Sequence, residues 1–367
     1  MLSSAARPAQ GERDSMKAVI LVGGEGTRLR PLTLTVPKPV VPVVDRPFLR
    51  HQLDLLAKVG VTEIVFSVAY RPQRIQAVFG DGSARGCRIH YAVEDTPLGT
   101  GGAVKNAETF LDDTTIVFNG DVLTDVDLPA VVGGHRESGA KATLVLTPVP
   151  NPAAYGLVET DPTGRVKSFI EKPTDPAQIT CDTINAGIYV LDTTTLSLMP
   201  PGENHSIERA FFPTLLRRGD LVRGWIHRGY WIDIGTPEKY LQVHRDILRG
   251  RFPVALEGVA RDGGWVHTEA RVEDGATLEG PFYIGPRCRV AAGAHVGPDA
   301  VLTRNVTVRT GASVRDSVVW DSTTLAESST ADGALLASRV RVGAFARVGP
   351  GAVLGEGSLI SDHSRTR

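Results

Sequence analysis

The chain has 367 residues, of which 42% are hydrophobic and 22% are charged, values typical of a folded globular protein with two or three domains. Its formal net charge of -1 excludes a whole-chain attraction to nucleic acid or to a membrane surface, so any bound phosphate must be handled by a local site. Cys87, Cys181 and Cys288 are far apart and show no Cys-x-x-Cys spacing, which argues against a zinc site or a disulfide framework and favours reduced thiols.

The first fifteen residues are small and polar, and no apolar segment of a secretory signal follows their arginines. We predict that residues 1–15 form a disordered tail and that the fold begins near Met16. No window approaches the ~18 apolar residues that a membrane-spanning helix needs. With the reduced thiols, these features predict a cytoplasmic protein that binds neither nucleic acid nor a membrane.

Strand and helix patterns alternate from Lys17 to about residue 250, which predicts an open α/β sheet. The predicted strands are Lys17–Val22, Glu63–Val68, Arg88–Val93, Thr115–Phe118, Lys141–Thr147 and Val166–Ile170. Pro47–Val59 has the pattern of an amphipathic helix that ends at Gly60. Pro237–Leu248 closes the region as a second helix, with Thr236 as its N-cap and Pro237 at its first position.

After about residue 255 an aliphatic residue returns every six positions, from Val266 to Val314 and again from Val342 to Ile360. A six-residue period predicts a parallel β-helix, here of about five coils, and it resembles the left-handed β-helix of hexapeptide-repeat proteins. The stretch from Trp320 to about Ala334 breaks the rhythm and predicts a loop or a loosened coil. The predicted division is therefore a domain over residues 16–250, a linker over 251–262 and a β-helix over 263–367.

The segment Leu21–Lys38 combines glycines that follow a strand with several cations. Its glycines are Gly23, Gly24 and Gly26, and its cations are Arg28, Arg30 and Lys38. Glycines at such a turn let backbone N–H groups approach phosphate oxygens. The segment is neither a Walker loop nor a dinucleotide fingerprint, because it lacks both spacings.

With Thr27 and Pro37-Lys38-Pro39, this segment resembles the signature of the sugar-phosphate nucleotidyltransferases, Gly-Gly-x-Gly-Thr-Arg-Leu followed by Pro-Lys-Pro. Further motifs of that family follow in order: Pro97-Leu98-Gly99-Thr100, Asn119-Gly120-Asp121, Tyr155-Gly156, Glu171-Lys172-Pro173, Asn185-Ala186-Gly187 and Trp231-Ile232-Asp233-Ile234-Gly235. The resemblance extends from Met16 to Ile360 and is closest to the mannose-1-phosphate guanylyltransferase branch. It implies a Rossmann-like nucleotidyltransferase domain with a mixed central sheet, followed by a left-handed β-helix.

The same resemblance assigns the expected site residues. It implies that Asp121 and Asp233 hold Mg²⁺, which suits a hard cation completed by phosphate oxygens and water. Spacing alone would favour a surface-turn aspartate and a helix-flanking aspartate, and the motif context reverses that interpretation. The expected nucleotide-binding residues are Leu21, Gly23, Gly24, Gly26, Thr27, Glu94, Pro97 and Gly99. The expected sugar-phosphate residues are Gly156, Glu171, Lys172 and Asn185, and the expected catalytic residues are Arg28, Lys38, Lys172 and the two aspartates.

The reagents of this family indicate the mechanism. A sugar phosphate is already an oxygen nucleophile, so cations and positioning are expected to do most of the catalytic work. We expect Arg28 to neutralise the β- and γ-phosphates and Lys38 to steady either the α-phosphate region or the incoming phosphate. Glu94 stands where pyrimidine-using relatives usually carry glutamine, and a carboxylate accepts from both donors of guanine, which favours GTP. The alternative is a solvated loop glutamate.

Several alternatives stay open beside the synthesis of GDP-mannose. Within the class they are UTP- or dTTP-dependent transfer to glucose 1-phosphate and guanylyl transfer to another sugar. Outside it they are a non-catalytic regulatory paralogue and a hexapeptide-repeat acyltransferase, for which His267 and His295 are the candidate histidines, although both are expected to be surface residues. We expect homo-oligomerisation through the β-helix, because the open end of a β-helix presents unpaired edges.

Overall fold

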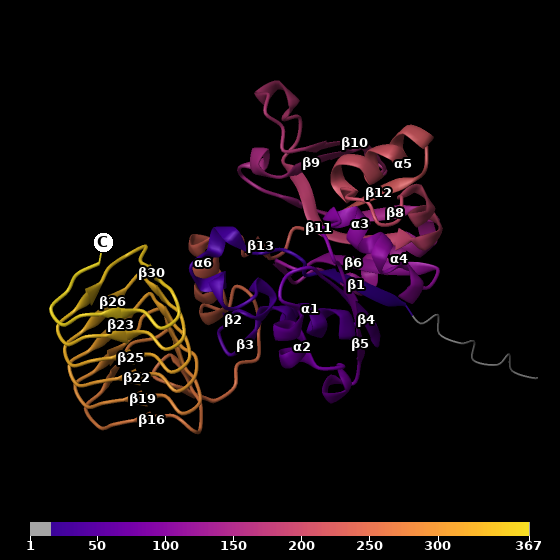
Figure 1. Cartoon of the computed structure of the whole chain (residues 1–367). Helices are drawn as coiled ribbons and strands as arrows, with labels where there is room; N and C mark the ends of the chain where they lie inside the picture. Colours follow the sequence, from indigo (N-terminus) through magenta and orange to yellow (C-terminus); the bar gives the residue numbers. More distant parts are fainter. Residues whose placement is uncertain (1–15, 367) are drawn as a thin grey trace, which may run out of the picture.

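The structure, a computed structural model, describes residues 16–366 and shows an α/β domain followed by a β-helix (Figure 1). The predicted disordered tail of residues 1–15 lies outside the described residues. The mixed sheet and the stacked short strands confirm the predicted fold class. Within the described residues, no helix is long and apolar enough to cross a membrane.

A nine-stranded sheet forms the centre of the α/β domain, in the order β10-β9-β11-β6-β1-β4-β5, with β8 paired to β11 and β12 paired to β8. Its strands are β1 (Lys17–Leu21), β4 (Glu63–Val68), β5 (Arg88–Val93), β6 (Thr114–Asn119), β8 (Ala142–Pro148), β9 (Gly156–Thr160), β10 (Val166–Glu171), β11 (Thr183–Asp192) and β12 (Val222–Ile226). Strands β1, β4, β5 and β6 are parallel, and β11 runs antiparallel to β6, so the sheet is mixed.

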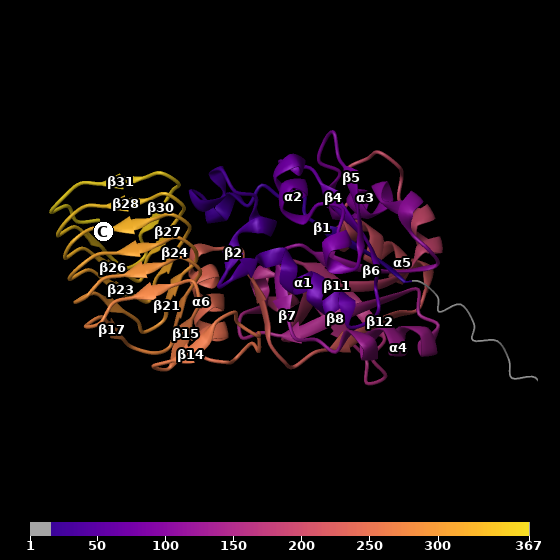
Figure 2. The same ribbon diagram turned by 90° about the horizontal axis from the view of Figure 1, so that it is seen from below.

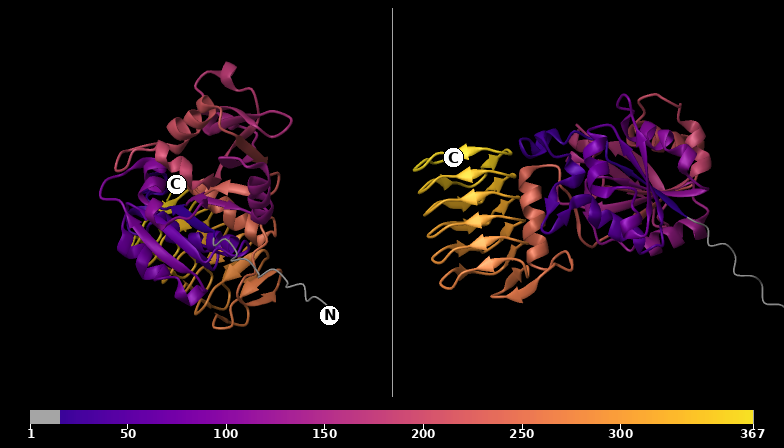
Figure 3. Two further views of the ribbon diagram at one scale, coloured as in Figure 1. Left: turned by 90° about the vertical axis from the view of Figure 1, so that its right-hand side faces the viewer. Right: turned by 60° about the horizontal axis from the view of Figure 1, so that its bottom comes forward.

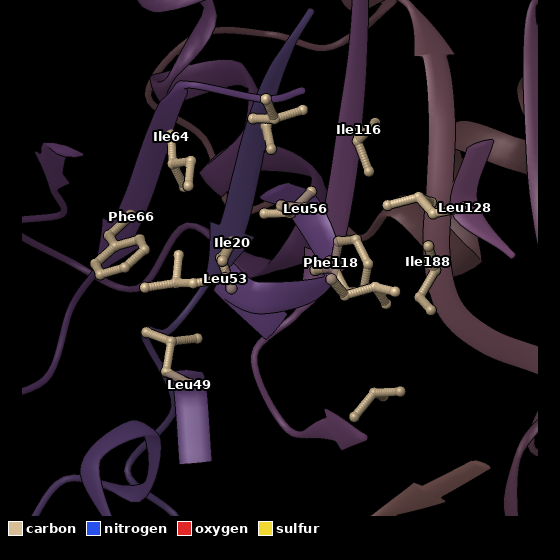
Figure 4. Close-up of a cluster of buried hydrophobic side chains, with 14 of the residues drawn as sticks. Ile20, Leu49, Leu53, Leu56, Ile64, Phe66, Ile116, Phe118, Leu128 and Ile188 are labelled. Carbon is tan, nitrogen blue, oxygen red and sulfur yellow. The ribbon is translucent and has the colours of Figure 1, made fainter. Parts of the chain in front are cut away.

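Helices cover both faces of this sheet, which is why its central strands are apolar on both sides. The helices are α1 (Phe48–Ala57), α2 (Pro72–Phe79), α3 (Gly99–Asn106), α4 (Leu128–Ser138), α5 (Phe212–Arg218) and α6 (Pro237–Leu248). Ile20 and its neighbours pack against α1 and α4 on one face (Figure 4). Val19, one residue earlier, packs with α3 and α5 on the other face. The predicted open α/β sheet is thus confirmed, and its two layers of helices are a finding of the structure.

The β-helix consists of three stacked parallel sheets, whose coils are seen edge-on in Figure 3. The first contains β15 (Gly264–Val266), β18 (Phe282–Ile284), β21 (Ala300–Leu302), β24 (Val318–Val319), β27 (Leu335–Leu336) and β30 (Val353–Leu354). The second contains β16 (Arg271–Val272), β19 (Arg289–Val290), β22 (Thr307–Val308), β25 (Thr324–Leu325), β28 (Arg341–Val342) and β31 (Leu359–Ile360). The third contains β17 (Thr277–Leu278), β20 (His295–Val296), β23 (Ser313–Arg315), β26 (Thr330–Asp332) and β29 (Arg347–Val348).

The prediction of a loop or loosened coil from Trp320 to about Ala334 is wrong, because β25 and β26 keep the coils regular there. Val290 pairs with Val308, eighteen residues on, whereas Val308 pairs with Leu325, seventeen residues on. Each of two successive coils lacks one corner residue, which shifts the phase of the six-residue period without interrupting the coil.

The estimate of about five coils is also low, since the second sheet stacks six strands. Strand β14 (Val259–Arg261) pairs antiparallel with β15 and lies inside the segment that we predicted as a linker.

The two domains share a hydrophobic core, which the sequence did not predict. Helix α6 lies between the β-helix and the rest of the α/β domain, as Figure 2 shows. Tyr240 of α6 is fully buried against the outer face of the first β-helix sheet, and its hydroxyl accepts a hydrogen bond of 3.1 Å from Nε1 of Trp320. Arg245 and Arg249 of the same helix form two-point ion pairs with Asp316 and Asp299. The β-helix therefore supports the helix that follows Asp233.

Candidate active site

Two adjoining pockets lie at the carboxyl ends of the parallel strands, the usual position of ligands in open α/β sheets. The first pocket is lined by residues from the ends of β1, β4, β5 and β6 and the start of α3, among them Leu21, Gly23, Gly24, Gly26, Thr27, Arg28, Lys38, Glu94, Pro97, Gly99, Thr100, Asn119 and Asp121. The second pocket is lined by Arg28, Asn119, Asp121, Tyr155, Gly156, Glu171, Lys172, Asn185, Glu208, Trp231 and Asp233, among others. Every site residue predicted from the sequence lies on one of these two walls.

The glycine segment bends sharply after β1. Gly26 has φ of 64°, a left-handed conformation that favours glycine, and it precedes the short helix η1 (Thr27–Leu29). A Cβ on Gly26 would lie only 3.2 Å from the Cβ of Lys38, so the bend also brings the two ends of the signature segment together. The hydroxyl of Thr33 closes the turn by donating to the carbonyl of Gly26 at 2.8 Å.

Glu94 is a buried residue of the first pocket, so the alternative of a solvated loop glutamate is wrong. Its Oε1 accepts from the hydroxyl of Ser67 at 2.8 Å, and its Oε2 accepts from the backbone N–H of Leu98 at 2.9 Å. A carboxylate oxygen has lone pairs for more than one hydrogen bond, so both oxygens retain acceptor capacity toward the pocket.

A short two-stranded sheet brings Asp121 and Asp233 together. Strand β13 (Trp231–Asp233) pairs antiparallel with β7 (Val122–Thr124), and the N–H of Ile234 donates to the carbonyl of Asp121 at 3.0 Å. Lys38 donates to Oδ2 of Asp121 at 2.8 Å, and Lys239 forms an ion pair with Oδ1 of Asp233. Each aspartate thus faces the second pocket with a lysine at its side.

Neighbouring positive charges control the protonation of Asp121. Burial alone would raise the pKa of Asp121, but Lys38, Arg28 and Lys239 outweigh burial and hold the pKa below its usual value. An ionised carboxylate is the form that binds a hard cation. Within residues 16–366 no group of three or more His, Cys, Asp or Glu side chains forms a metal cluster. Two carboxylates nevertheless fit Mg²⁺, which usually takes one or two carboxylates and completes its shell with phosphate and water.

Arg28 lies where the two pockets meet and lines both. A Cβ on Gly235 would approach Nη2 of Arg28 to 2.8 Å and Oδ2 of Asp233 to 2.9 Å. The glycine therefore leaves room for a guanidinium beside the carboxylate. A pocket boundary with an arginine, a lysine and two carboxylates can bind phosphates and a divalent cation at one place.

The second pocket is polar and carries the predicted sugar-phosphate residues. A Cβ on Gly156 would lie 2.6 Å from Oε2 of Glu171, so this glycine makes space for the carboxylate. Asn185 is held by two hydrogen bonds, because its Nδ2 donates to the hydroxyl of Tyr189 at 2.8 Å and its Oδ1 accepts from the N–H of Gly187 at 3.0 Å. The side chain of Lys172 is 61% exposed at the rim of the pocket.

Sequence reasoning missed four residues at this site: Tyr155, Glu208, Trp231 and Lys239. Tyr155 and Trp231 belong to two of the recognised motifs, which could have suggested them, but no role at the site was assigned to either residue. The hydroxyl of Tyr155 donates to Oδ1 of Asp233 at 3.0 Å. Glu208 and Lys239 come from segments without a recognised motif, and only the tertiary fold brings them to the pocket.

Comparison with known proteins covers both domains. A family described as nucleotidyl transferase matches residues 17–250, and one described as the GMPPB C-terminal domain matches residues 266–366. All residues of both pockets lie inside the first match.

Individual relatives are similar over most of the chain. A mannose-1-phosphate guanylyltransferase of Mycobacterium tuberculosis is 44% identical over 284 residues, which are 77% of this chain and 76% of the relative. A UTP–glucose-1-phosphate uridylyltransferase of Synechocystis is 32% identical over 348 residues, which are 90% of this chain and 88% of the relative. The crystal structure of HddC from Yersinia pseudotuberculosis complexed with GMP-PN is 29% identical with a TM-score of 0.54, and covers 62% of this chain and 97% of that one.

Proposed function

The chain belongs to the nucleotidyl transferase family, and from this premise we propose that it transfers the guanylyl group of GTP to mannose 1-phosphate, forming GDP-mannose and pyrophosphate. The choice of GTP and mannose 1-phosphate is supported by the relative from Mycobacterium tuberculosis, whose name states that activity. The guanine nucleotide GMP-PN in the HddC complex supports the same choice of base.

One observation carries the proposal: the two pockets share the wall formed by Arg28, Asn119 and Asp121. The glycine segment of the first pocket suits a nucleoside triphosphate, because its backbone can approach phosphate oxygens closely. The carboxylates and amide of the second pocket suit the hydroxyl groups of a sugar. The shared wall is where a sugar phosphate and the α-phosphate of a nucleotide would meet.

In the proposed reaction an oxygen of the sugar phosphate attacks the α-phosphorus of GTP, and the bond from that phosphorus to the oxygen bridging to the β-phosphate breaks. The electron pair of the broken bond leaves with pyrophosphate. Arg28 would neutralise the departing phosphates, Lys38 would steady the α-phosphate, and Lys172 would bind the incoming phosphate. This assignment lets positioning and charge neutralisation do the catalytic work, without a covalent enzyme intermediate.

Asp121 and Asp233 are the residues that would hold a divalent cation, and we propose Mg²⁺. Bound there, the ion would supply charge neutralisation and orientation of the α-phosphate. Lys38 lies beside Asp121 and helps to hold the pKa of that carboxyl below its usual value, and Lys239 forms an ion pair with Asp233. Glu94 would accept from the two guanine donors, a role supported by its burial in the first pocket.

A second candidate is UTP- or dTTP-dependent transfer to glucose 1-phosphate, which is favoured by the 90% coverage of this chain by the Synechocystis relative. Guanylyl transfer to another sugar is a further variant within the class. A non-catalytic paralogue is disfavoured by the two aspartates and three cations assembled at the pockets. An acyltransferase is disfavoured because each candidate histidine lies beside an exposed glutamate: His267 contacts Glu257, and His295 contacts Glu279.

We also propose a cytoplasmic homo-oligomer that associates through the β-helix. Leu359 on the last strand is 71% exposed and Phe345 on a preceding corner is 53% exposed, and apolar groups at the end of a stack are usually covered by a partner. Light scattering tests this proposal, and a monomeric full-length protein would contradict it.

The reaction is tested by measuring pyrophosphate release over a matrix of nucleoside triphosphates and sugar 1-phosphates with Mg²⁺. The expected maximum is GTP with mannose 1-phosphate, and its product should have the mass of GDP-mannose. A maximum at UTP or dTTP with glucose 1-phosphate would support the second candidate. Release with no combination would contradict the proposed enzyme class.

A further inference from the structure

Glu208 reaches the second pocket from an unusual helix. It is the second residue of the π-helix η9 (Ile207–Phe211), which precedes α5 and packs against α3 and β10. Single π turns within helices occur often at functional sites, because they redirect one side chain. Here the turn places a carboxylate on the wall of the sugar-side pocket.

Only one of the two oxygens of Glu208 is used by the protein. Oε2 accepts from the hydroxyl of Thr100 at 2.6 Å and from the hydroxyl of Ser206 at 2.9 Å. Among the described residues, none donates a hydrogen bond to Oε1. The side chain is therefore held in one orientation and retains a free acceptor in a pocket that it lines.

Thr100 connects this carboxylate to the other pocket. It lies in the first turn of α3 and lines the first pocket, where its hydroxyl accepts from the backbone N–H of Ile207 at 3.0 Å while it donates to Glu208. One hydroxyl thus fixes both the start of the π-helix and its carboxylate. It joins the wall of one pocket to the wall of the other.

The backbone around this hydroxyl is tightly packed. The N–H groups of Gly101 and Gly102 both donate to the carbonyl of His205, at 2.8 and 3.1 Å, and the N–H of His205 donates to the carbonyl of Leu98 at 2.8 Å. A Cβ on Gly102 would lie 2.5 Å from the carbonyl oxygen of Glu203, so only glycine permits this approach. The segment before Glu208 and the start of α3 therefore form one unit.

Glu171 and Glu208 are two carboxylates on the wall of the second pocket. Burial raises the pKa of Glu171, and the neighbouring charge of Glu208 raises it further, against the lowering by Lys172 and Arg209. Two close carboxylates repel each other and are stabilised when donors lie between them. The adjacent hydroxyl groups of a sugar ring are donors of this kind.

We propose that Glu208 accepts a hydrogen bond from a ring hydroxyl of the sugar phosphate through Oε1 and so helps to determine which sugar is used, and that Thr100 is the positioning residue that orients it. This inference rests on the proposed function, because it concerns the sugar substrate of that reaction. It adds a residue to the site that neither the sequence motifs nor the comparisons assign.

The first test compares Glu208→Gln with Glu203→Gln as a matched control, since Glu203 is an exposed glutamate five residues earlier that lines neither pocket. In Glu208→Gln the amide oxygen should take the place of Oε2, which accepts from Thr100 and Ser206, so that the amide nitrogen faces the sugar. Losing the hydrogen bond to a charged acceptor then predicts a rise of roughly 10–100-fold in KM for mannose 1-phosphate. KM for GTP should change less than about twofold, because only the sugar contact is removed. Equal rises in both KM values, or none, would overturn the inference.

The second test separates orientation from folding. Thr100→Val removes the hydroxyl that donates to Oε2, and it should raise KM for the sugar phosphate in the same direction as Glu208→Gln. Thr100→Ser keeps the hydroxyl and should restore values close to wild type. A serine variant as impaired as the valine variant would show that the methyl packing of Thr100 matters, and would contradict its positioning role.

The third test identifies the hydroxyl with a series of deoxy analogues of mannose 1-phosphate. One analogue should be used poorly by the wild type yet suffer no additional penalty in Glu208→Gln, because the contact is already absent. If Glu208→Gln impairs every analogue as much as the parent sugar, Glu208 contacts no hydroxyl and the inference is wrong. Absence of wild-type turnover with any sugar 1-phosphate would instead contradict the proposed function itself.

Discussion

Replacement of Asp121 by asparagine should separate the catalytic role of this carboxylate from its contribution to stability. The substitution preserves shape but removes the charge that pairs with Lys38, whose ammonium lies 2.8 Å from Oδ2 and whose side chain is 11% exposed. A hydrogen bond between charged groups contributes about 1.5–3 kcal/mol. Because the Asp121 side chain is 34% exposed, solvent screening reduces this contribution to about 1 kcal/mol.

The same substitution also removes the cost of burying the Asp121 charge, which opposes that loss. We therefore expect the unfolding midpoint to fall by no more than about 4 °C. Activity should respond very differently. Loss of one preorganised group that stabilises developing charge lowers kcat by about 10²–10³-fold, and loss of a carboxylate that holds the cation should lower it at least as much.

The assay measures pyrophosphate release at saturating substrates and Mg²⁺, and thermal unfolding with and without GTP and Mg²⁺. Wild-type protein should be stabilised more by GTP with Mg²⁺ than by GTP alone, and Asp121→Asn should lose that difference. Asp95→Asn, at an exposed residue outside both pockets, is the matched control. A near-normal rate in Asp121→Asn would refute the assigned role, as would a rate loss that merely follows unfolding.

The other predictions concern the phosphates, the base, pH and the domain interface. Arg28→Ala should lower kcat by roughly 10²–10³-fold with a smaller effect on KM for GTP. A change in KM alone would show that Arg28 binds the substrate and the transition state equally, and would contradict its catalytic role. Glu94→Gln should lower kcat/KM for GTP by about 10–100-fold relative to kcat/KM for UTP. An unchanged ratio of the two kcat/KM values would show that Glu94 does not select the base. Burial lowers the pKa of His51 to about 4 and that of His244 to about 3, so the unfolded state binds more protons below pH about 6.5 and stability should fall as the pH drops from there toward 4. For His51 the free energy of unfolding should fall by up to about 3 kcal/mol over this range. Denaturant titrations should show that the free energy of unfolding depends less on pH in His51→Leu than in the wild type, but not in the surface control His295→Gln. An equal pH dependence in His51→Leu and the wild type would show that His51 is not the cause. Removal of residues 263–367 should expose the shared core and give a protein with little cooperative unfolding in calorimetry, whereas a stable, active fragment would show that the core is dispensable.

Local signals explain which parts of the fold could be predicted. Strand β5 and helix α6 have the predicted bounds, because their patterns and the Thr236 cap are encoded within a few residues. The coils after Val314 were misread because two corners each lack one residue, which a fixed period of six cannot follow. The strands there form regardless, since their inward side chains still stack on those of the coil before.

The residues of the site likewise fall into two groups, those that sequence motifs identified and those that only the fold brings to the pockets. Motif order identified residues of both pockets, because each motif contributes a backbone turn or a side chain at a strand end. The bond from Thr100 to Glu208 and the ion pair of Asp233 with Lys239 each join a motif residue to a residue outside the motifs. Only the fold brings Thr100 and Glu208 together, because more than a hundred residues separate them in the sequence. The contact of Tyr240 with Trp320 likewise depends on how the domains pack.

The most direct test of the central claim is the ratio of kcat/KM for GTP with mannose 1-phosphate to that for UTP with glucose 1-phosphate, measured with Mg²⁺ in the same preparation. Mass spectrometry of the product identifies the nucleotide-sugar, and Asp121→Asn serves as the blank. The proposed function predicts that the ratio greatly exceeds one, that the product is GDP-mannose, and that one pyrophosphate is released for each product formed. A ratio below one, or turnover that persists in Asp121→Asn, would contradict it.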